Sequence, residues 1–423
     1  MIILGHIYMK ANIKVHPKVK PVEKIEGEKN AKSSTIYAAA LKELDLTGTV
    51  AHHYGFTAIT APKVTTEDKS LAKKFVTPYS SLGENEERLA LMRLFQDGQF
   101  SRFPQPTMLY YKKPFGGSDT KKKTSVEMCG LQIVNVGRAA AEALIVQAAW
   151  AMLADSGCDK MRIEINSVGD KESLARFTRE LQSYYRKHVG TLSAEYRQKY
   201  KDDIFAIASC TEKECSEFAD NAPKSLSSLS EASRLHFKEV LEFLESADLP
   251  YVINSSLLPN TEYASHTCFE IHGSLERGGP EILLARGGRY NYLAKKAGYK
   301  RDVVCCDSTV YYPKKIAEKK KGLERVKPAN FYLVQLGTMA KFQTLTIIEM
   351  LRRENIGVYH ALTKESIVGQ LASAEYLHVS HLLIIGQKEA MEKSVVVRSA
   401  DVRDQETVKV CDLCVYLKRI QKR

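Results

Sequence analysis

Thr267-Cys-Phe-Glu-Ile271 begins the stretch that decides the fold, which continues past Gly273 to Glu281-Ile-Leu-Leu-Ala-Arg286 and Gly287-Gly288-Arg289-Tyr290. Both apolar runs have the length and composition of β-strands, and Gly273 marks a turn between them. Two adjacent glycines after a strand let the backbone approach another group closely, although a plain tight turn or bulge is the alternative. The pattern therefore predicts two strands, the second ending in a turn at Gly287-Gly288-Arg289-Tyr290.

Strand signals recur on both sides of this pair. Apolar and polar residues alternate over residues 161–166, as they do in a strand with one buried face. Shorter strand-like runs occupy residues 56–59, 108–111 and 251–253, whereas residues 170–249 have mostly helical patterns. These observations predict an α+β core of strands and helices over residues 34–313.

The pattern changes at a charged run over residues 314–327, which is typical of a solvated linker. Beyond it, strand and helix patterns alternate over residues 328–423, and this alternation predicts a small α/β domain with a largely parallel sheet. At the other end of the chain, residues 1–33 are rich in lysine, and we expect a loose basic extension there.

The composition is that of an ordinary globular protein with an excess of positive charge. Of the 423 residues, 44% are hydrophobic and 26% are charged, and the formal net charge is +12 with a pI near 9.0. This excess favours a polyanion such as RNA as a partner, although a well-solvated basic surface is the alternative. The longest apolar stretch, residues 139–153, is too short and too polar to span a bilayer. We expect a cytoplasmic protein that does not interact with membranes.

The nine cysteines do not have the spacing of a metal site or of a disulfide framework. Cys210 and Cys215 are separated by four residues and have no second pair nearby. Cys411 and Cys414 form a CxxC within a predicted helix, without histidine or cysteine partners in the surrounding sequence. We therefore predict free thiols and no bound metal.

Several segments in order along the chain resemble the histidyl-tRNA synthetases, a family of class II aminoacyl-tRNA synthetases. They include residues 54–62, residues 103–106, residues 267–271 with Gly287-Gly-Arg-Tyr290, and residues 385–405 near the C-terminus. The resemblance implies an antiparallel class II core with a helical insertion at about 185–245, and a C-terminal anticodon-binding-like domain. It also implies ATP and magnesium as cofactors of any surviving ligase activity, and a homodimer formed through the strand at 56–62.

The resemblance also assigns roles to individual residues. The positions that match the family's ligand pocket are Gln132, Glu262, Tyr263, Gly287, Gly288, Arg289 and Tyr290. Lys112 and Lys113 are the candidates for contact with phosphate. Lys388, Arg398, Arg403 and Gln405 match the anticodon-binding domain and are the candidates for contact with tRNA or another structured RNA.

The sequence departs from the family where adenylation needs positive charge. Pro259 stands at the position of the family's histidine-specific arginine, and Lys112 and Lys113 stand where its second motif has arginine. Residues 305–312 contain no arginine, although the family's third motif ends in one. Each lost cation at a developing charge costs on the order of 3–4 kcal/mol, judged from oxyanion donors. We therefore assign no catalytic residue and expect that histidyl-adenylate is not formed.

Three functions remain open from the sequence. The first, which we favour, is a degenerate synthetase-like protein that binds tRNA, another RNA or a protein partner. The second is a divergent but active histidine–tRNA ligase. The third is a synthetase-like regulatory subunit that senses a small molecule, although the proteins of that kind lack the C-terminal domain that this chain resembles.

Overall fold

The computed structural model describes residues 43–77, 82–101, 103–113, 126–188, 190, 193–208, 220–313, 324–325, 328–364, 366–400 and 404–421. The predicted extension at 1–33 and most of the predicted linker at 314–327 lie outside these residues. Because of these gaps, the predicted domain boundaries stay predictions. None of the described helices is both long and apolar enough to cross a bilayer.

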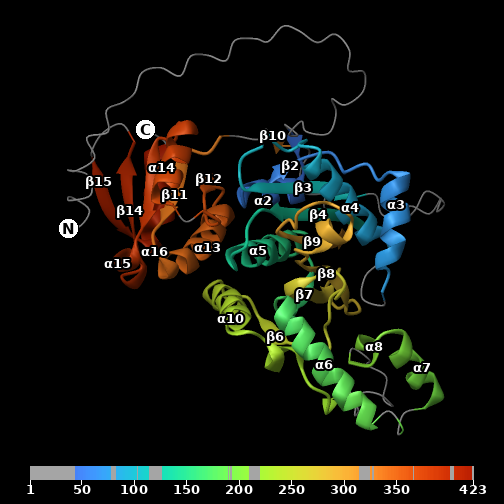
Figure 1. Cartoon of the computed structure of the whole chain (residues 1–423). Coiled ribbons are helices and arrows are strands. Elements are labelled where there is room, and N and C mark those ends of the chain that lie inside the picture. The colour runs from blue at the N-terminus through green and yellow to red at the C-terminus, as the bar shows by residue number, and fades with distance from the viewer. Residues whose placement is uncertain are drawn as a thin grey trace, which may run out of the picture. The chain divides into compact units, whose positions relative to one another are not determined.

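An eight-stranded sheet forms the centre of the first part of the described chain (Figure 1). Its strands lie in the order β2 (Thr57–Ala58), β3 (Thr107–Lys113), β4 (Val126–Val134), β9 (Cys305–Pro313), β8 (Ile282–Arg289), β7 (Ser265–Ser274), β5 (Asp159–Ser167) and β6 (Tyr251–Ile253). Neighbouring strands from β3 to β5 are all antiparallel, and only the outer pairs β2–β3 and β5–β6 are parallel. The predicted α+β fold with an antiparallel core is confirmed.

Helices cover both faces of this sheet. On β3, Leu109 and Tyr111 pack against α4 (Leu82–Gln96), whereas Tyr110 belongs to the cluster around α5 (Ala140–Asp155). Because successive strand residues point to opposite faces, α4 and α5 lie on opposite sides of the sheet. Nearly every residue of α5 is buried, which explains its continuous apolar sequence.

The remaining elements of this part surround the sheet. They are β1 (Glu43–Leu44), which pairs with β10 (Glu324–Arg325), α2 (Leu46–His53), α3 (Thr66–Ala72), the 3-10 turns Lys73–Phe75 and Ser225–Ser228, α6 (Lys171–His188), α7 (Ala194–Asp202), α8 (Phe205–Ala208), α10 (Glu231–Ser246) and α11 (Leu293–Lys296). Helices α6, α7 and α8 enclose a small hydrophobic cluster of their own around Phe177, Leu181 and Phe205. Asp170 caps α6 by accepting from the amide of Ser173 at 2.9 Å.

The C-terminal part contains a second sheet of five strands. Their order is β12 (Val358–His360), β11 (Phe331–Gln335), β13 (His381–Ile385), β14 (Ser394–Ser399) and β15 (Gln405–Lys409), with helices α13 (Thr338–Arg353), α14 (Ile367–Tyr376), α15 (Gln387–Met391) and α16 (Val410–Gln421). The predicted largely parallel sheet is wrong in part, because β13–β14 and β14–β15 are antiparallel. The connections at 386–393 and 400–404 are too short for the crossover that a parallel pair needs.

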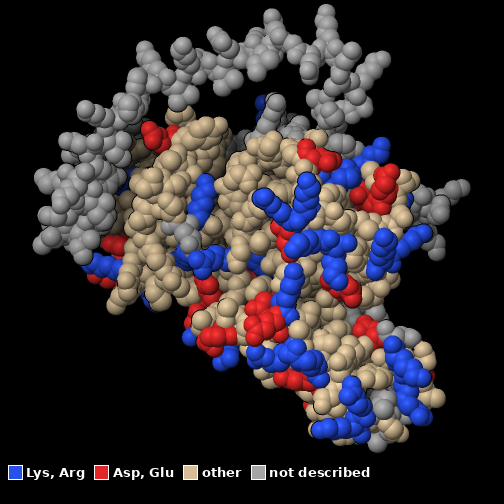
Figure 2. All heavy atoms as spheres, in the orientation of Figure 1, with Lys and Arg blue, Asp and Glu red and all other residues tan. Residues whose placement is uncertain are grey.

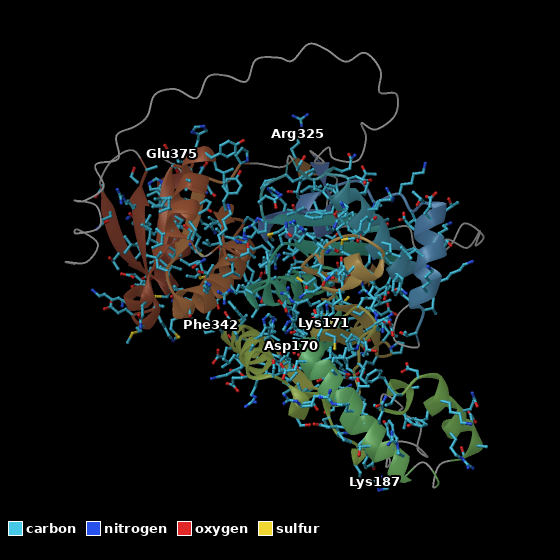
Figure 3. All side chains as sticks on the ribbon, viewed as in Figure 1. Asp170, Lys171, Lys187, Arg325, Phe342 and Glu375 are labelled. Atoms are coloured by element: carbon cyan, nitrogen blue, oxygen red, sulfur yellow. The ribbon has the colours of Figure 1, made fainter. Side chains whose placement is uncertain are left out.

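Contacts between α13 and the first part are specific. The ring of Phe342, labelled in Figure 3, packs edge-on against Phe243 of α10 with centroids 4.7 Å apart. Arg352 donates to Asp155 of α5 at 2.6 Å and to Glu349 at 2.7 Å. Tyr54, directly after α2, donates to Glu349 as well. These partly buried aromatic and ionic contacts hold α13 against α5 and α10.

Candidate ligand pocket

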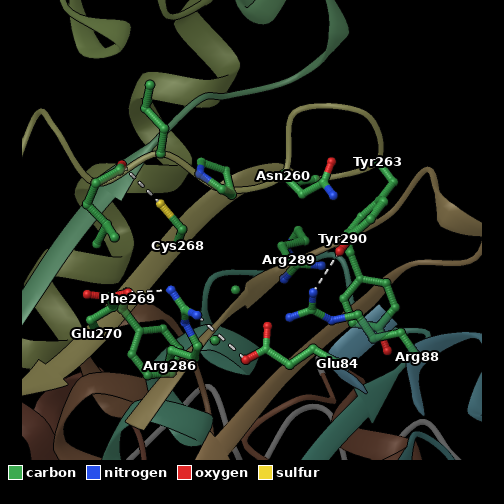
Figure 4. A pocket seen from close by; sticks show the side chains of 16 residues that line it. Glu84, Arg88, Asn260, Tyr263, Cys268, Phe269, Glu270, Arg286, Arg289 and Tyr290 are labelled. Carbon is green, nitrogen blue, oxygen red and sulfur yellow. Dashed lines mark hydrogen bonds and ion pairs between the residues drawn. The ribbon is translucent and has the colours of Figure 1, made fainter. Parts of the chain in front are cut away.

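The pocket at the centre of the antiparallel sheet is small. It lies between α4, the loop 257–264 and the strands β7 and β8 (Figure 4), and its lining residues are Glu84, Arg88, Leu257, Leu258, Pro259, Asn260, Tyr263, Ala264, Cys268, Phe269, Glu270, Arg286, Gly287, Gly288, Arg289 and Tyr290. The cavity volume is about 50 Å³. Pockets for small molecules and cofactors usually enclose roughly 300–1,000 Å³. The open space in this pocket is therefore much smaller than that of a usual cofactor site.

The side chain of Arg88, from α4, occupies much of the space between the two pocket tyrosines (Figure 4). Its Nε and Nη2 atoms donate to the two carboxylate oxygens of Asp307 on β9, at 2.7 and 3.1 Å. Its Nη1 atom donates to the hydroxyl of Tyr263 at 2.8 Å. The guanidinium also lies 5.2 Å from the ring centroid of Tyr290 and 5.8 Å from that of Tyr263, within the range of cation–π attraction.

This environment keeps Arg88 charged. Burial acts to lower the pKa of its guanidinium, but attraction to Asp307 and to Tyr263 outweighs burial, so the pKa lies well above its ordinary value. Tyr263 in turn donates to Asn85 at 2.6 Å, and Asn85 donates to the backbone oxygen of Phe75 at 2.8 Å. Arg88 therefore belongs to a buried hydrogen-bond network that runs through Tyr263 and Asn85 to the backbone of Phe75.

A second group of charges borders the same pocket. Arg286 of β8 donates to Glu270 of β7 at 2.8 Å and lies 3.8 Å from Glu84 of α4. Glu270 also lies 2.9 Å from the imidazole of His272, and together these contacts outweigh burial and lower the pKa of Glu270. The positive charge of Arg286 is therefore already engaged by carboxylates.

Arg289 has a structural partner beneath the pocket. Only 1% of this side chain is exposed. It forms a two-point ion pair with Glu142 of α5, with one contact at 2.7 Å, and Nη1 donates to the backbone oxygen of Val136 at 2.7 Å. Glu142 also contacts His236 at 2.7 Å, and attraction from Arg289 and His236 overcomes burial and lowers the pKa of Glu142 to about 2. This network joins β8 to α5 and α10.

Gly287 and Gly288 lie inside β8 rather than in a turn, so the predicted turn is wrong. A Cβ atom on Gly287 would lie 2.1 Å from the backbone oxygen of Asp307 in β9, and one on Gly288 would lie 2.7 Å from the backbone oxygen of Thr267 in β7. The register of β7 against β8 shifts between Ser265 and Cys268, opposite the end of β8. The glycines thus serve the close approach of three strands.

The structure brings part of the predicted pocket together. Tyr263, Gly287, Gly288, Arg289 and Tyr290 line the cavity, and so does Pro259. Gln132 lies beside it on β4 and accepts a hydrogen bond from the Tyr290 hydroxyl at 2.7 Å. The Gln132 amide nitrogen has no hydrogen-bond partner within the described chain.

Three predicted residues lie elsewhere. Glu262 is half exposed, pairs with Lys296 at 3.0 Å and borders a separate surface cavity. Lys112 pairs with Asp45 at 2.5 Å and with Glu127 at 3.2 Å, and Lys113 pairs with Glu87 and donates to Thr309 at 2.8 Å. The amino groups of both candidate phosphate ligands are therefore bound to carboxylates outside the cavity lining.

Sequence reasoning missed Arg88, Glu84 and Asp307. Arg286, the last residue of the strand run that starts at Glu281, received no role from the sequence, and the structure places it in the pocket lining. A usable signal existed in Glu84 and Arg88, which are four residues apart and so share one face of α4. Their partners on β8 and β9 could not be read from that spacing.

The predicted RNA contacts lie on the second sheet and its helices. Lys388, on α15, is exposed and lies 3.9 Å from Glu392. Arg398 of β14 pairs in register with Gln405 of β15, which is exposed. Arg403 lies outside the described residues. In the described parts of the chain, no group of three histidine, cysteine or acidic side chains is arranged to hold a metal ion.

Comparison with known proteins links both parts of the chain to one kind of protein. The family described as "Anticodon binding domain" matches residues 332–420. The histidine–tRNA ligase of Fervidobacterium nodosum is 28% identical over 320 residues, covering 73% of this chain and 74% of that protein. The corresponding ligase of Bacillus velezensis is 25% identical over 343 residues, covering 80% and 81%.

Solved structures include similar chains as well. The apo histidyl-tRNA synthetase of S. aureus covers 87% of this chain and 93% of its own, at 18% identity and a TM-score of 0.48. The comparisons thus show what the chain is similar to: anticodon-binding domains over residues 332–420, and histidine–tRNA ligases over 73–80% of its length.

Proposed function

We propose that this protein does not form histidyl-adenylate and acts instead by binding tRNA, another structured RNA or a protein partner. The observation that carries the proposal is the pocket, in which Arg88 leaves an open volume of only about 50 Å³ and the bordering charges neutralise one another. This open space is too small for ATP together with histidine unless side chains move.

The energetics of opening the pocket support the proposal. Adenylation builds negative charge on the α-phosphate, which needs a preorganised cation. Arg88 could serve only by leaving Asp307, and separating a buried pair costs about 3–5 kcal/mol when one partner is left alone. Arg286 is engaged by Glu270 in the same way. Catalysis would therefore require that these ion pairs break first, and the free energy lost in breaking them would add to the barrier of the reaction.

The distribution of exposed lysine and arginine side chains supports RNA as the ligand. Lys and Arg side chains are dense over α6 and α7 (Figure 2), and α6 ends in Arg186, Lys187 and His188. Lys187 is labelled at the far end of α6 in Figure 3 and is exposed. With Lys388 on α15, these residues would engage phosphates in the salt-dependent way typical of nucleic-acid binding.

An active ligase is the second candidate. Two arginines, Arg88 and Arg286, do line the pocket, and the curated relatives at 25–28% identity are ligases. In that case ATP and magnesium would be required, and Arg88 would have to turn from Asp307 towards the phosphate. A sensor of small molecules is less well supported, because the closed pocket has little room for a ligand.

One pair of measurements tests the proposal. Histidine-dependent exchange of pyrophosphate into ATP, in the presence of magnesium, should stay at background. Exchange above background that Tyr290→Ala abolishes would instead establish the ligase. In a mobility-shift titration, tRNA should bind with an affinity that falls steeply with salt.

A matched pair of variants tests where RNA binds. Lys388→Glu should weaken binding several-fold and lower the magnitude of the salt slope. Lys238→Glu is the control, because Lys238 is similarly exposed at 69% against 76% and also pairs with a glutamate four residues on, but lies on α10. Equal effects of the two variants, or no binding of RNA at low salt, would count against the C-terminal domain as the binding element. Absence of both exchange and RNA binding would leave the protein partner as the proposed ligand.

We further propose a cytoplasmic homodimer. The edge strand β2 pairs with β3 on one side only within the described residues, and it coincides with the segment that resembles the family's dimer strand. The seven cysteines in the described residues are free, in keeping with a reducing compartment. Light scattering at micromolar concentration should give twice the mass of one chain, and a monomer would refute the dimer.

A further inference from the structure

Two cysteines lie at the beginning of α16 and have no role in the proposed function. The strand β15 ends at Lys409 and α16 begins at Val410, so Cys411 and Cys414 occupy its first turns. Cys411 is exposed and Cys414 is partly buried, and both are free thiols. They form the CxxC that has no histidine or cysteine partners in the surrounding sequence and so does not fit a metal site.

Both thiols face the same space. Cys411, Cys414, Val415 and Lys418 line one cavity of about 560 Å³, together with Trp150 of α5 and Met350 of α13. Their spacing of three, four and seven residues is that of a single helix face. Residues three apart on a helix have Cβ atoms roughly 5–6 Å apart, and a disulfide needs about 3.5–4.5 Å. A small adjustment of the helix is therefore enough to join the two sulfur atoms.

The first turn of a helix can make such an adjustment at low cost. Its amide groups have no intrahelical acceptors, so a local change there breaks few backbone hydrogen bonds. The cavity of about 560 Å³ lies beside the exposed Cys411, so a low-molecular-weight disulfide can reach this thiol. Cys129, Cys268, Cys305 and Cys306 are poor competitors because they are buried, whereas Cys158 is partly buried.

We propose that Cys411 and Cys414 form a reversible redox site that exchanges with low-molecular-weight disulfides. The Cys411 thiolate attacks a disulfide RSSR, which forms a mixed disulfide with Cys411 and releases one thiolate RS⁻. The Cys414 thiolate then attacks the Cys411 sulfur, which closes the intramolecular disulfide and releases the second RS⁻. The two protons lost by the cysteines are taken up by the released thiolates, so the protein loses two electrons and RSSR becomes two RSH.

Trypsin offers a direct measurement on the full-length protein. Cleavage after Lys409 and Lys418 releases residues 410–418, which contain both cysteines and no other. The folded protein is equilibrated with mixtures of reduced and oxidised glutathione, quenched by alkylation and digested. Mass spectrometry then gives the ratio of internal disulfide to doubly alkylated peptide, and the same equilibration in guanidinium gives the ratio for the unfolded chain.

We expect the ratio of internal disulfide to doubly alkylated peptide to be at least tenfold higher in the folded protein than in the chain unfolded by guanidinium. Cys414→Ser should trap glutathione on Cys411 as a stable adduct, since the resolving thiol is gone. Cys158→Ser is the control and should leave the ratio unchanged, because Cys158 does not line the cavity. Equal ratios in the folded and unfolded chain, a folded chain in which the peptide stays fully alkylated, or a mixed disulfide that persists in the wild type would each overturn the proposal.

Discussion

Replacing Arg88 with methionine should destabilise the protein strongly. The change keeps an unbranched apolar stem but removes the two-point ion pair with Asp307 and the hydrogen bond to Tyr263. Only 14% of the Arg88 side chain and 11% of the Asp307 side chain are exposed. Because the carboxylate of Asp307 would remain without its partner, we expect the free energy of unfolding to fall by about 3–5 kcal/mol.

Arg93 supplies the matched control on the same helix. It forms an ion pair with Asp68 at 3.0 Å, with 26% of the Arg93 side chain and 6% of the Asp68 side chain exposed. Asp68 keeps a hydrogen bond from the backbone amide of Thr65 at 2.9 Å when Arg93 is lost, so Arg93→Met should cost less than Arg88→Met. Urea unfolding followed by circular dichroism measures both variants, and an unchanged dependence on urea concentration shows that the folded state is still compact.

A double variant separates the ion pair from lost packing. Asp307→Asn removes the charge that Arg88 neutralises, and Arg88→Met with Asp307→Asn should cost less than the sum of the two single changes. We expect a coupling energy of roughly 2 kcal/mol or more, within the range for residues in direct contact. If Arg88→Met costs no more than Arg93→Met, or if the coupling vanishes, then the ion pair between Arg88 and Asp307 does not stabilise the folded protein.

Two further predictions concern strand packing and pH. Gly287→Ala should lower the free energy of unfolding by about 1–3 kcal/mol or more, because the added Cβ would lie 2.1 Å from a backbone oxygen that cannot move alone. Gly137→Ala is the control: no atom lies within 4 Å of its added Cβ, so the free energy of unfolding in urea should change by less than about 0.5 kcal/mol. Burial lowers the pKa of His360 to about 4, and burial with repulsion from His360 does the same for His53. The unfolded chain, with a histidine pKa of about 6.5, then binds more protons than the folded chain between pH 6.5 and 4, so stability should fall as the pH is lowered through this range, by on the order of 2 kcal/mol per histidine at pH 5. Urea midpoints at pH 7 and pH 5 check the direction, and a His360→Gln variant that loses as much stability as the wild type would contradict it.

Much of the sheet could be predicted because strands leave a local pattern. The alternation over 161–166 lies within β5. The run at 56–59 contains β2, the run at 108–111 lies within β3, and the run at 251–253 is β6. β4 was not recognised as a strand, since Gly130 interrupts its apolar pattern. That glycine is required because a Cβ there would lie 2.4 Å from the ring of Tyr111 on the neighbouring strand. The requirement comes from the partner strand and has no local signal.

The same limit applied to the pocket. Gly287 and Gly288 indicated a close approach, but the group approached is the backbone of two neighbouring strands, so the apparent turn is the interior of β8. Arg88 and Asp307 are 219 residues apart in sequence, and Arg88 and Tyr263 are 175 apart. No periodicity within one element connects such residues. Their meeting follows only from the order of strands in the sheet.

Missing residues and occupied space are independent arguments against adenylation. The first is that Pro259 stands where the resemblance leads us to expect an arginine. A cation from elsewhere could take that place, and Arg286 lines the same pocket. The second is that Arg88 lies beside the rings of Tyr263 and Tyr290 and leaves an open volume of only about 50 Å³, which a substitute cation would not enlarge. A substrate would have to displace Arg88 from Asp307 before any group could act on it. Arg88→Met tests the second argument alone, because it removes the guanidinium and leaves Arg286 in the pocket lining. If the variant gains binding of ATP that the wild type lacks, the side chain of Arg88 was what kept the nucleotide out.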